Sequence, residues 1–171
     1  HSNDVTVKLG QDRQITIHEN SLVEDWEITM VDTGEQTLKG ARIHKIAKYI
    51  DDDFMITYGD GMSDIDINSL VSFHKKHGKI ATMTGVSPRS SYGQITAEDG
   101  KVLDFIEKPK FDEGVVNGGF FIFQKKFFDY LNPNDDCAFE IGPLEQLTKE
   151  GQLMVYHHKG DWICMDTYRD S

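Results

Sequence analysis

Short apolar runs alternate along the chain with segments of helical periodicity, and this alternation limits the folds open to it. The run Phe54–Tyr58 is mainly apolar and leads into glycine. The segment Asp66–His77 then spaces its apolar residues along one face of a helix, with Asp66 as a predicted N-cap and Gly78 as a stop. An apolar run of this kind suits a strand covered on both faces, as in a parallel sheet. The pattern predicts an α/β domain.

The same alternation extends over all 171 residues, a length that fits one domain, residues 1–171. The order of elements predicts a three-layer α/β/α domain with a mixed sheet and an antiparallel hairpin insertion. Glu98–Lys101 predicts a tight turn between two of the strands. The other predicted strands are Val5–Leu9, Gln14–His18, Trp26–Val31, Lys79–Val86, Gly93–Thr96, Lys101–Glu107, Gly118–Phe123, Leu153–His157 and Trp162–Met165, and the other predicted helices are Ala41–Ile50, Lys125–Leu131 and Phe139–Lys149.

A net negative charge narrows the classes of partner. The sequence carries 29 acidic and 18 basic residues, a formal charge of -11. This argues against nucleic-acid partners, which proteins bind through clustered lysine and arginine side chains. No run approaches the roughly 20 apolar residues that a membrane helix needs, and the polar first residues do not resemble a signal peptide. Cys137 and Cys164 have no CxxC spacing, so we expect reduced thiols in a cytoplasmic protein.

The sharpest local feature is Tyr58-Gly59-Asp60-Gly61, at the end of the apolar run. Open α/β sheets bind their ligands beyond the carboxyl ends of strands, and the glycines allow close approach of a ligand. Because Mg²⁺ prefers hard oxygen ligands, Asp60 is a candidate metal ligand. An aspartate that caps its own turn is the alternative, and the spacing leaves the two equally open.

A second acidic motif, Asp64-Ile65-Asp66, matches the DxD pattern of metal-dependent glycosyltransferases. The tripeptide is weak support, because chance matches are common in a chain with 29 acidic residues. Asp66 also has a local role as a helix N-cap. We therefore favour a structural role for this motif over a metal site.

Three more segments end or begin strands with polar side chains. Lys108 precedes a proline that fixes the exit from a strand, and a placed ammonium can bind a phosphate. From these residues alone, a solvated strand end is the slightly favoured alternative. Asn117 precedes a glycine pair and is suited either to a turn or to sugar hydroxyls. Asp166 ends an apolar run, where an aspartate is costly to bury unless it is paired or bound to a metal. Asp166 is therefore the natural second carboxylate for the metal site proposed at Asp60. The histidines have no spacing typical of a zinc site.

Taken in order, these segments resemble the sugar-1-phosphate nucleotidyltransferases. The Gly-Asp-Gly, Glu-Lys-Pro and Asn-Gly-Gly-Phe-Phe elements are shared across that family, and a Val-Asp-Thr-Gly segment followed by Gly-Ala-Arg points to its glucose-1-phosphate cytidylyltransferase branch. The resemblance covers nearly the whole chain. It rests on Trp26–Gly34, Thr57–Gly61, Glu107–Lys110, Val116–Phe121 and Met165–Asp170.

The resemblance implies the Rossmann-like, GT-A-like fold of this family. It also implies transfer of CMP from CTP to α-D-glucose 1-phosphate, which forms CDP-glucose and pyrophosphate. It implies a Mg²⁺-dependent cytoplasmic enzyme of nucleotide-sugar synthesis for lipopolysaccharide O-antigen, and a homo-oligomer. By the same likeness, the catalytic set would be Asp60, Lys108 and Asp166, with Asp60 and Asp166 as the metal ligands, and Glu107, Asn117, Gly93 and Arg42 would bind substrate.

Two departures from the family pattern qualify these expectations. Tyr92-Gly93-Gln94-Ile95 stands where Phe-Gly-Ala-Leu is expected, which leaves the shape of the sugar pocket open. The family's opening strand and its glycine-rich triphosphate loop are not in this sequence, nor is its C-terminal tail. We therefore expect this chain to be inactive by itself and its parent to be the enzyme. The alternatives are a non-catalytic binding or assembly subunit, and a glycosyltransferase that uses Asp64 and Asp66.

Overall fold

A computed structural model describes residues 5–8, 14–17, 27–87, 94–106 and 115–165 of the chain. The chain divides into two compact units, His1–Asp32 and Thr33–Ser171, which are treated separately below. The prediction of a single domain is not tested by this division. No helix among the described residues is long and apolar enough to cross a membrane.

The first unit contains a β-hairpin. Strands β1 (Val5–Lys8) and β2 (Gln14–Ile17) pair antiparallel, with Val5 opposite Ile17, which confirms the predicted hairpin. The predicted strand Trp26–Val31 is wrong over its described residues, because 27–32 have no regular secondary structure. Ile28 and Met30 are 72% and 85% exposed, so the apolar side chains that suggested a strand are not buried. A strand also needs a neighbour for its backbone hydrogen bonds.

The second unit is built on a mixed sheet of four strands in the order β3-β8-β5-β9. Strand β8 (Val116–Phe123) pairs antiparallel with β3 (Phe54–Thr57) and with β5 (Ala81–Val86), whereas β5 and β9 (Leu153–His158) are parallel. The predicted mixed sheet is thus confirmed. The prediction that β3 is covered on both faces is wrong for the described chain. It is an antiparallel edge strand, and Met55 is 48% exposed.

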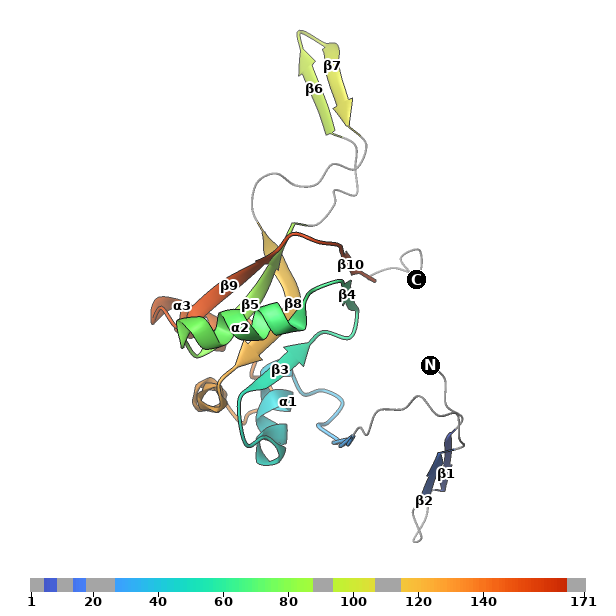
Figure 1. Cartoon of the computed structure of the whole chain (residues 1–171), viewed down its shortest axis with the longest axis vertical. Helices are drawn as coiled ribbons and strands as arrows, with labels where there is room; N and C mark the ends of the chain where they lie inside the picture. Colours follow the sequence, from blue (N-terminus) through green and yellow to red (C-terminus); the bar gives the residue numbers. More distant parts are fainter. Residues whose placement is uncertain (1–4, 9–13, 18–26, 88–93, 107–114, 166–171) are drawn as a thin grey trace. The chain divides into compact units, whose positions relative to one another are not determined.

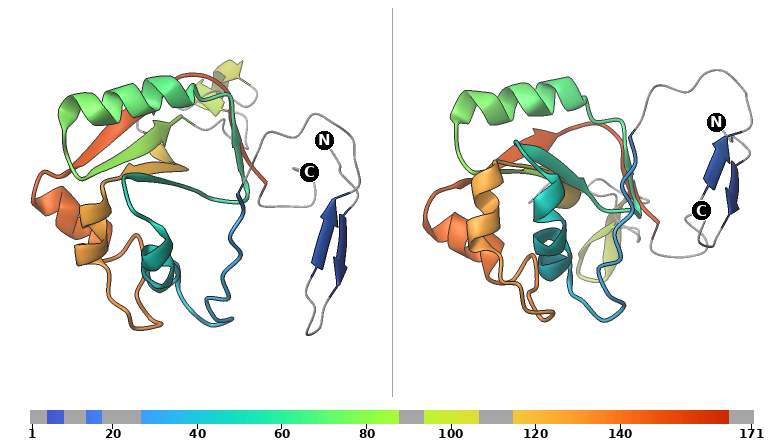
Figure 2. Two further views of the ribbon diagram at one scale, coloured as in Figure 1. Left: turned by 60° about the horizontal axis from the view of Figure 1, so that its bottom comes forward. Right: turned by 90° about the horizontal axis from the view of Figure 1, so that it is seen from below.

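Helices cover both faces of this sheet, which confirms the three-layer prediction. Helix α2 (Ile67–His77) lies over one face, and α1 (Lys39–Ile46), η2 (Lys125–Tyr130) and α3 (Pro143–Lys149) lie on the other (Figure 1; Figure 2, left). The predicted helix Ala41–Ile50 begins two residues earlier, at Lys39, and ends in a 3₁₀ turn, η1 (Ala47–Tyr49). The two later predicted helices are shorter than expected. The first, η2, is a 3₁₀ helix that ends at Tyr130, and α3 begins at Pro143, a residue favoured in the first helical turn.

The face that carries α1, η2 and α3 holds the aromatic core. Alternation along β8 turns Phe121 and Phe123 toward this layer, where both are at most 1% exposed. Phe127 of η2 stacks on Phe123 with ring centroids 4.0 Å apart, and Phe139 meets both β8 rings edge to face. Ile43 anchors α1 to the same cluster. This packing fixes the layer from which one wall of the candidate site is built.

The ends of α2 follow the sequence signals. The Asp66 carboxylate accepts hydrogen bonds from the backbone N–H of Asn68 and of Ser69, and Gly78 ends the helix in the left-handed conformation at φ 65°. Leu70 and His74 are buried against the sheet, where His74 Nδ1 lies 2.7 Å from Thr82 Oγ1. The N-cap and stop predicted for this helix are confirmed.

Two short antiparallel pairs complete the described elements. Strands β6 (Gln94–Glu98) and β7 (Lys101–Ile106) form the predicted hairpin, whose turn has positive φ at Asp99 and Gly100. Strands β4 (Gly61–Ser63) and β10 (Trp162–Cys164) form a ribbon with Cys164 opposite Gly61. Cys137 is buried and Cys164 is half-buried.

Candidate active site

The loop Tyr58–Gly61 connects the main sheet to the β4–β10 ribbon. Strand β3 ends at Thr57, and the backbone N–H of Tyr58 then donates to the Gly119 carbonyl at 3.0 Å. The ribbon is also fastened to β8, because Trp162 Nε1 donates to the Gly118 carbonyl at 2.8 Å. Asp60 therefore lies on a short loop that is held at both ends, and its side chain is exposed.

The ribbon brings the end of β10 to the start of β4. Because the strands are antiparallel, the residue that follows β10 lies beside the residue that precedes β4. The backbone N–H of Met165 donates to the Asp60 carbonyl at 2.8 Å. Asp166 follows Met165 directly in the sequence and lies outside the described residues.

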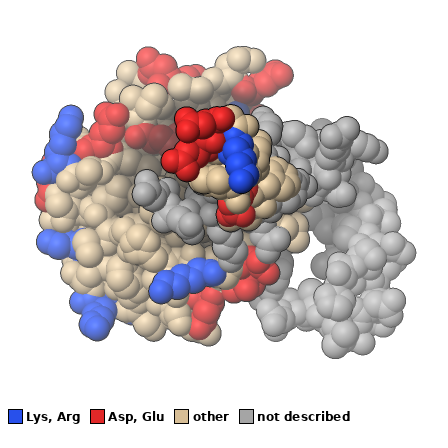
Figure 3. All heavy atoms as spheres, turned by 90° about the horizontal axis from the view of Figure 1, so that it is seen from above, with Lys and Arg blue, Asp and Glu red and all other residues tan. Residues whose placement is uncertain are grey.

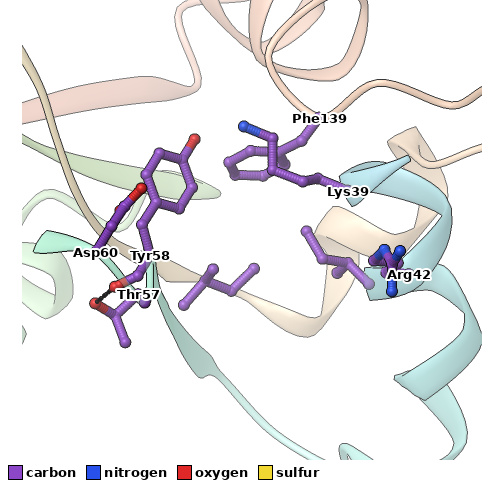
Figure 4. A pocket seen from close by; sticks show the side chains of 9 residues that line it. Lys39, Arg42, Thr57, Tyr58, Asp60 and Phe139 are labelled. Carbon is purple, nitrogen blue, oxygen red and sulfur yellow. Dashed lines mark hydrogen bonds between the residues drawn. The ribbon is translucent and has the colours of Figure 1, made fainter. Parts of the chain in front are cut away.

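A cleft of about 390 Å³ lies beside Asp60 (Figure 4). Its lining combines apolar side chains from β3, α1 and the segment before α3 with polar groups from Tyr58, Asp60 and Lys39. Lys39 Nζ lies 4.6 Å from the centroid of the Tyr58 ring, within cation–π range. The nine lining residues are Lys39, Arg42, Ile43, Ile56, Thr57, Tyr58, Gly59, Asp60 and Phe139.

Tyr58, Glu140 and Lys39 form a hydrogen-bonded cluster at this cleft. The Tyr58 hydroxyl donates to Glu140 Oε1 at 2.6 Å, and the Lys39 ammonium pairs with the same oxygen. Burial raises the pKa of Tyr58, and its hydrogen bond to the carboxylate raises this pKa further. Burial would raise the pKa of Glu140, but the hydrogen bonds from Lys39 and Tyr58 outweigh burial and lower it. At neutral pH the cluster therefore holds an ionised carboxylate between two donors.

Arg42, a predicted substrate ligand, also lines the cleft, but its guanidinium is occupied by its own loop. Nε donates to the Thr37 carbonyl at 2.7 Å, and Nη1 donates to Thr33 Oγ1 at 2.8 Å. A third donor, Nη2, reaches the Glu35 carbonyl at 3.0 Å. In Figure 4 the guanidinium points away from Tyr58 and Asp60. In this structure Arg42 fixes the loop before α1.

Asn117, a second predicted substrate ligand, lies at the start of β8 beside Tyr58. Its Oδ1 accepts from the Gly119 backbone N–H at 2.9 Å, a local turn contact, while Nδ2 lies 3.5 Å from the Tyr58 hydroxyl. Gly119 has φ 78°, and a Cβ there would lie 3.0 to 3.3 Å from the Tyr58 side chain. The glycine pair therefore allows close approach of the tyrosine ring to the β8 backbone, which connects two motifs that are separate in sequence.

The two DxD aspartates have structural partners. Asp64 Oδ1 accepts from His158 Nε2 and from the Asp161 backbone N–H, each at 2.8 Å. The Asp66 carboxylate caps α2 and also accepts from Ser69 Oγ at 2.7 Å, and these contacts with Ser69 lower its pKa. The structural role favoured for this motif is thus supported by direct contacts.

The remaining predicted site residues, Gly93, Glu107, Lys108 and Asp166, lie outside the described residues, so the structure brings together only Asp60, Asn117 and Arg42 of the predicted set. Within the described ranges, no group of three or more His, Cys, Asp or Glu side chains is arranged to hold a metal ion. On the face shown in Figure 3, the described acidic and basic side chains are interspersed rather than gathered into a basic surface.

Lys39 and Glu140 are the site residues that the sequence did not reveal. Neither belongs to a recognisable motif, and each reaches Tyr58 from a different element. Their only sequence signal is position: Lys39 lies two residues before the predicted helix Ala41–Ile50, and Glu140 lies in the predicted helix Phe139–Lys149.

The nucleotidyl transferase family model matches residues 3–167 of the chain. The chain belongs to the nucleotidyl transferase family. It is similar to the glucose-1-phosphate cytidylyltransferase of Salmonella typhi, with 41% identity over 99% of this chain and 66% of that protein. It is also 36% identical, over 53% of its length and 25% of the relative's, to a UTP–glucose-1-phosphate uridylyltransferase of Synechocystis.

A solved structure agrees in fold. HddC from Yersinia pseudotuberculosis matches with a TM-score of 0.58 and 24% identity, over 80% of this chain and 60% of that one. The chain therefore spans less than two thirds of the length of the Salmonella relative and of this solved structure. The α/β fold with a mixed sheet is the shared property at this distance.

Proposed function

We propose that the complete natural protein transfers CMP from CTP to α-D-glucose 1-phosphate, forming CDP-glucose and pyrophosphate. The observation that carries the proposal is the 41% identity, over 99% of this chain, to a protein named for that activity. The fold adds support, since the Gly-Asp-Gly loop and the Asn-Gly-Gly segment meet through Tyr58 in one site. Support of this kind favours an enzyme over a non-catalytic assembly subunit.

The proposed reaction joins two polyanions. An oxygen of the sugar phosphate attacks the α-phosphorus of CTP, the bond from that phosphorus to the bridging oxygen breaks, and pyrophosphate leaves with the electron pair. The attacking phosphate is already ionised at neutral pH, so no general base is needed. Catalysis by this protein would rest on positioning and on neutralising charge.

Asp60 suits the divalent cation that such a reaction uses. Mg²⁺ binds through one or two carboxylates, with substrate phosphates and water as its other ligands, so a cluster of three protein ligands is not required. The exposed carboxylate beside the cleft fits this role, with Asp166 as the proposed second ligand. When bound, Mg²⁺ would screen the phosphates from each other. Two carboxylates ~4 Å apart repel by ~4 kcal/mol at an effective dielectric of ~20, and the ion would remove this repulsion.

The other predicted roles remain part of the proposal. Lys108 would bind the phosphate of glucose 1-phosphate, Glu107 and Asn117 its hydroxyls, and Gly93 would shape the loop around the sugar. Arg42 would contact the triphosphate only if its guanidinium exchanged the carbonyls of Thr37 and Glu35 for phosphate oxygens. Of the proposed substrate-binding roles, that of Arg42 therefore has the least support. Homo-oligomer formation also stays a prediction.

A pyrophosphate-release assay on the complete protein tests the proposal. Each of CTP, UTP, GTP, ATP and dTTP is paired with glucose 1-phosphate at saturating Mg²⁺. We expect CTP to give the highest kcat/KM and CDP-glucose to form in step with pyrophosphate. Preference for another nucleotide, or no release with CTP, would refute the cytidylyl assignment. Hydrolysis of a nucleotide sugar without pyrophosphate formation would instead indicate a glycosyltransferase, which the contacts of Asp64 and Asp66 do not favour.

A further inference from the structure

We propose that Asp64 and His158 form a positioning pair that holds the β4–β10 ribbon in register and so keeps Asp60 in place for its divalent cation. The inference rests on the cation site proposed above. It assigns a role to the DxD motif that is neither catalysis nor direct metal binding. The pair closes the end of the ribbon opposite Asp60, where β4 leads into α2 and β9 leads into β10.

Several hydrogen bonds meet at the Asp64 end of the ribbon. A carboxylate oxygen only accepts, so His158 Nε2 carries the hydrogen that it donates to Asp64 Oδ1 at 2.8 Å. The same oxygen accepts from the Asp161 backbone N–H, while the Asp161 carbonyl accepts from Ser63 Oγ at 3.0 Å and from the Asp64 backbone N–H at 3.3 Å. Side-chain and backbone bonds thus close the turn between β9 and β10 onto the residue after β4.

The pair also connects the ribbon to the main sheet. His158 is the last residue of β9, and its side chain is only 10% exposed. The imidazole is therefore held by packing, whereas the Asp64 side chain that it contacts is 63% exposed. The ribbon is three residue pairs long, so few backbone bonds hold its register without this contact.

Gly160 gives an independent sign that this arrangement is specific. A Cβ at this position would overlap Asp64 Oδ1 and lie 2.7 Å from His158 Cε1 and 2.8 Å from His158 Nε2. Those atoms belong to the pair itself, so any side chain at 160 must displace one of its members. A substitution at Gly160 can therefore break the pair while Asp64 and His158 both keep their own side chains.

At the opposite end, register matters for the proposed cation site. The Met165 N–H bonds to the Asp60 carbonyl, directly continuing the pairing of Cys164 with Gly61. A slip of one residue would turn every side chain of β10 to the other face. Loss of the pair is therefore expected to loosen Asp60 relative to the chain that leads into Asp166, without removing any metal ligand.

Mn²⁺ titration of the complete protein, followed by electron paramagnetic resonance, tests this inference, with and without CTP. Asp64→Ala and Gly160→Ala should each weaken Mn²⁺ binding by about tenfold, the lower end of the effect of removing a group that orients a metal ligand. Asp64→Asn keeps an acceptor for His158 and for the Asp161 N–H, and should stay within about twofold of wild type. Asp66→Ala is the matched control: it loses the α2 cap, lowers the melting temperature and leaves Mn²⁺ affinity unchanged.

Several outcomes would overturn the inference. Wild-type Mn²⁺ affinity in both Asp64→Ala and Gly160→Ala would show that the pair does not position the site. Loss of binding in Asp64→Asn would make Asp64 a ligand, and equal weakening in Asp66→Ala would indicate a general effect of destabilisation. A wild type without a Mn²⁺ site in either condition would also refute it. Pyrophosphate release is not used in this titration, so failure of the CTP reaction is detected separately.

Discussion

The two ends of the β4–β10 ribbon each present an aspartate, four positions apart in sequence, yet their surroundings give them opposite roles. At one end, Asp60 contributes its backbone carbonyl to the ribbon and leaves its carboxylate beside the cleft. At the other end, the Asp64 carboxylate is taken by His158 and by the Asp161 N–H. The difference shows that an acidic motif near a binding cleft gains its role from its neighbours.

The partners of each end explain the contrast. Around Asp60, the firm contacts are made by the flanking groups: Tyr58 to Gly119, Trp162 to Gly118 and Met165 to the Asp60 carbonyl. The loop is therefore rigid while its carboxylate remains available. Around Asp64, the side chain itself supplies the contact that closes the turn. Rigid backbone with an available side chain is what a ligand-binding residue needs.

The strongest way to break this comparison is Asp60→Asn in the complete protein. The amide keeps the shape of the carboxylate but removes the charge that would hold the cation, which supplies several kcal/mol of charge stabilisation. We expect kcat/KM for CTP-dependent pyrophosphate release to fall at least about a hundredfold. Asp64→Asn is the matched control and should retain near-normal turnover. Equal losses in the two variants would remove the distinction between the ribbon ends.

A smaller effect is expected from Gly119→Ala, which disturbs the support of the Asp60 loop. An alanine there has a positive φ and a Cβ only 3.0 Å from the Tyr58 side chain. Gly78→Ala is the control, since it shares the positive φ but has nothing within 4 Å of its Cβ. Urea unfolding should show a cost of about 1–2 kcal/mol for Gly78→Ala. Gly119→Ala should cost more by about 1–3 kcal/mol because of overpacking. Equal costs would mean that the tyrosine ring does not depend on this close approach.

The smallest effect concerns pH and Glu140. Its pKa in the folded protein lies below the ordinary 4.5, so its ionised form contributes stability above that pH and loses the contribution as pH falls through the lowered pKa. Glu140→Gln keeps an acceptor for Tyr58 but loses the ion pair with Lys39. The melting temperature of wild type should therefore fall more steeply than that of the variant as the pH falls below the ordinary glutamate pKa of 4.5. Parallel profiles would contradict the role assigned to Lys39.

Local features of this chain were predictable from sequence because local residues determine them. The α2 cap at Asp66, its stop at Gly78 and the β6–β7 turn each need only a few adjacent residues. The wrongly predicted strand Trp26–Val31 shows the limit, because such a segment becomes a strand only where another strand pairs with it.

The site was predictable only where a motif carried it. Asp60 could be identified from its glycines, but the ribbon that supports it joins segments about a hundred residues apart, as does the contact of Asp64 with His158. Glu140 and Lys39 belong to no motif and reach Tyr58 only through the packing of α1 and the segment before α3. Side-chain geometry of this kind follows from tertiary packing, which spacing along the chain does not encode.

The central claim, that the ribbon ends differ in their affinity for a divalent cation, is tested most directly by an anomalous difference map. Crystals of the complete protein would be grown with Mn²⁺ and CTP. We predict a peak about 2.1 Å from a carboxylate oxygen of Asp60, the distance typical of a small hard cation. No peak is expected on Asp64, whose oxygen should still accept from His158. A peak on Asp64 or Asp66, with none on Asp60, would contradict the account.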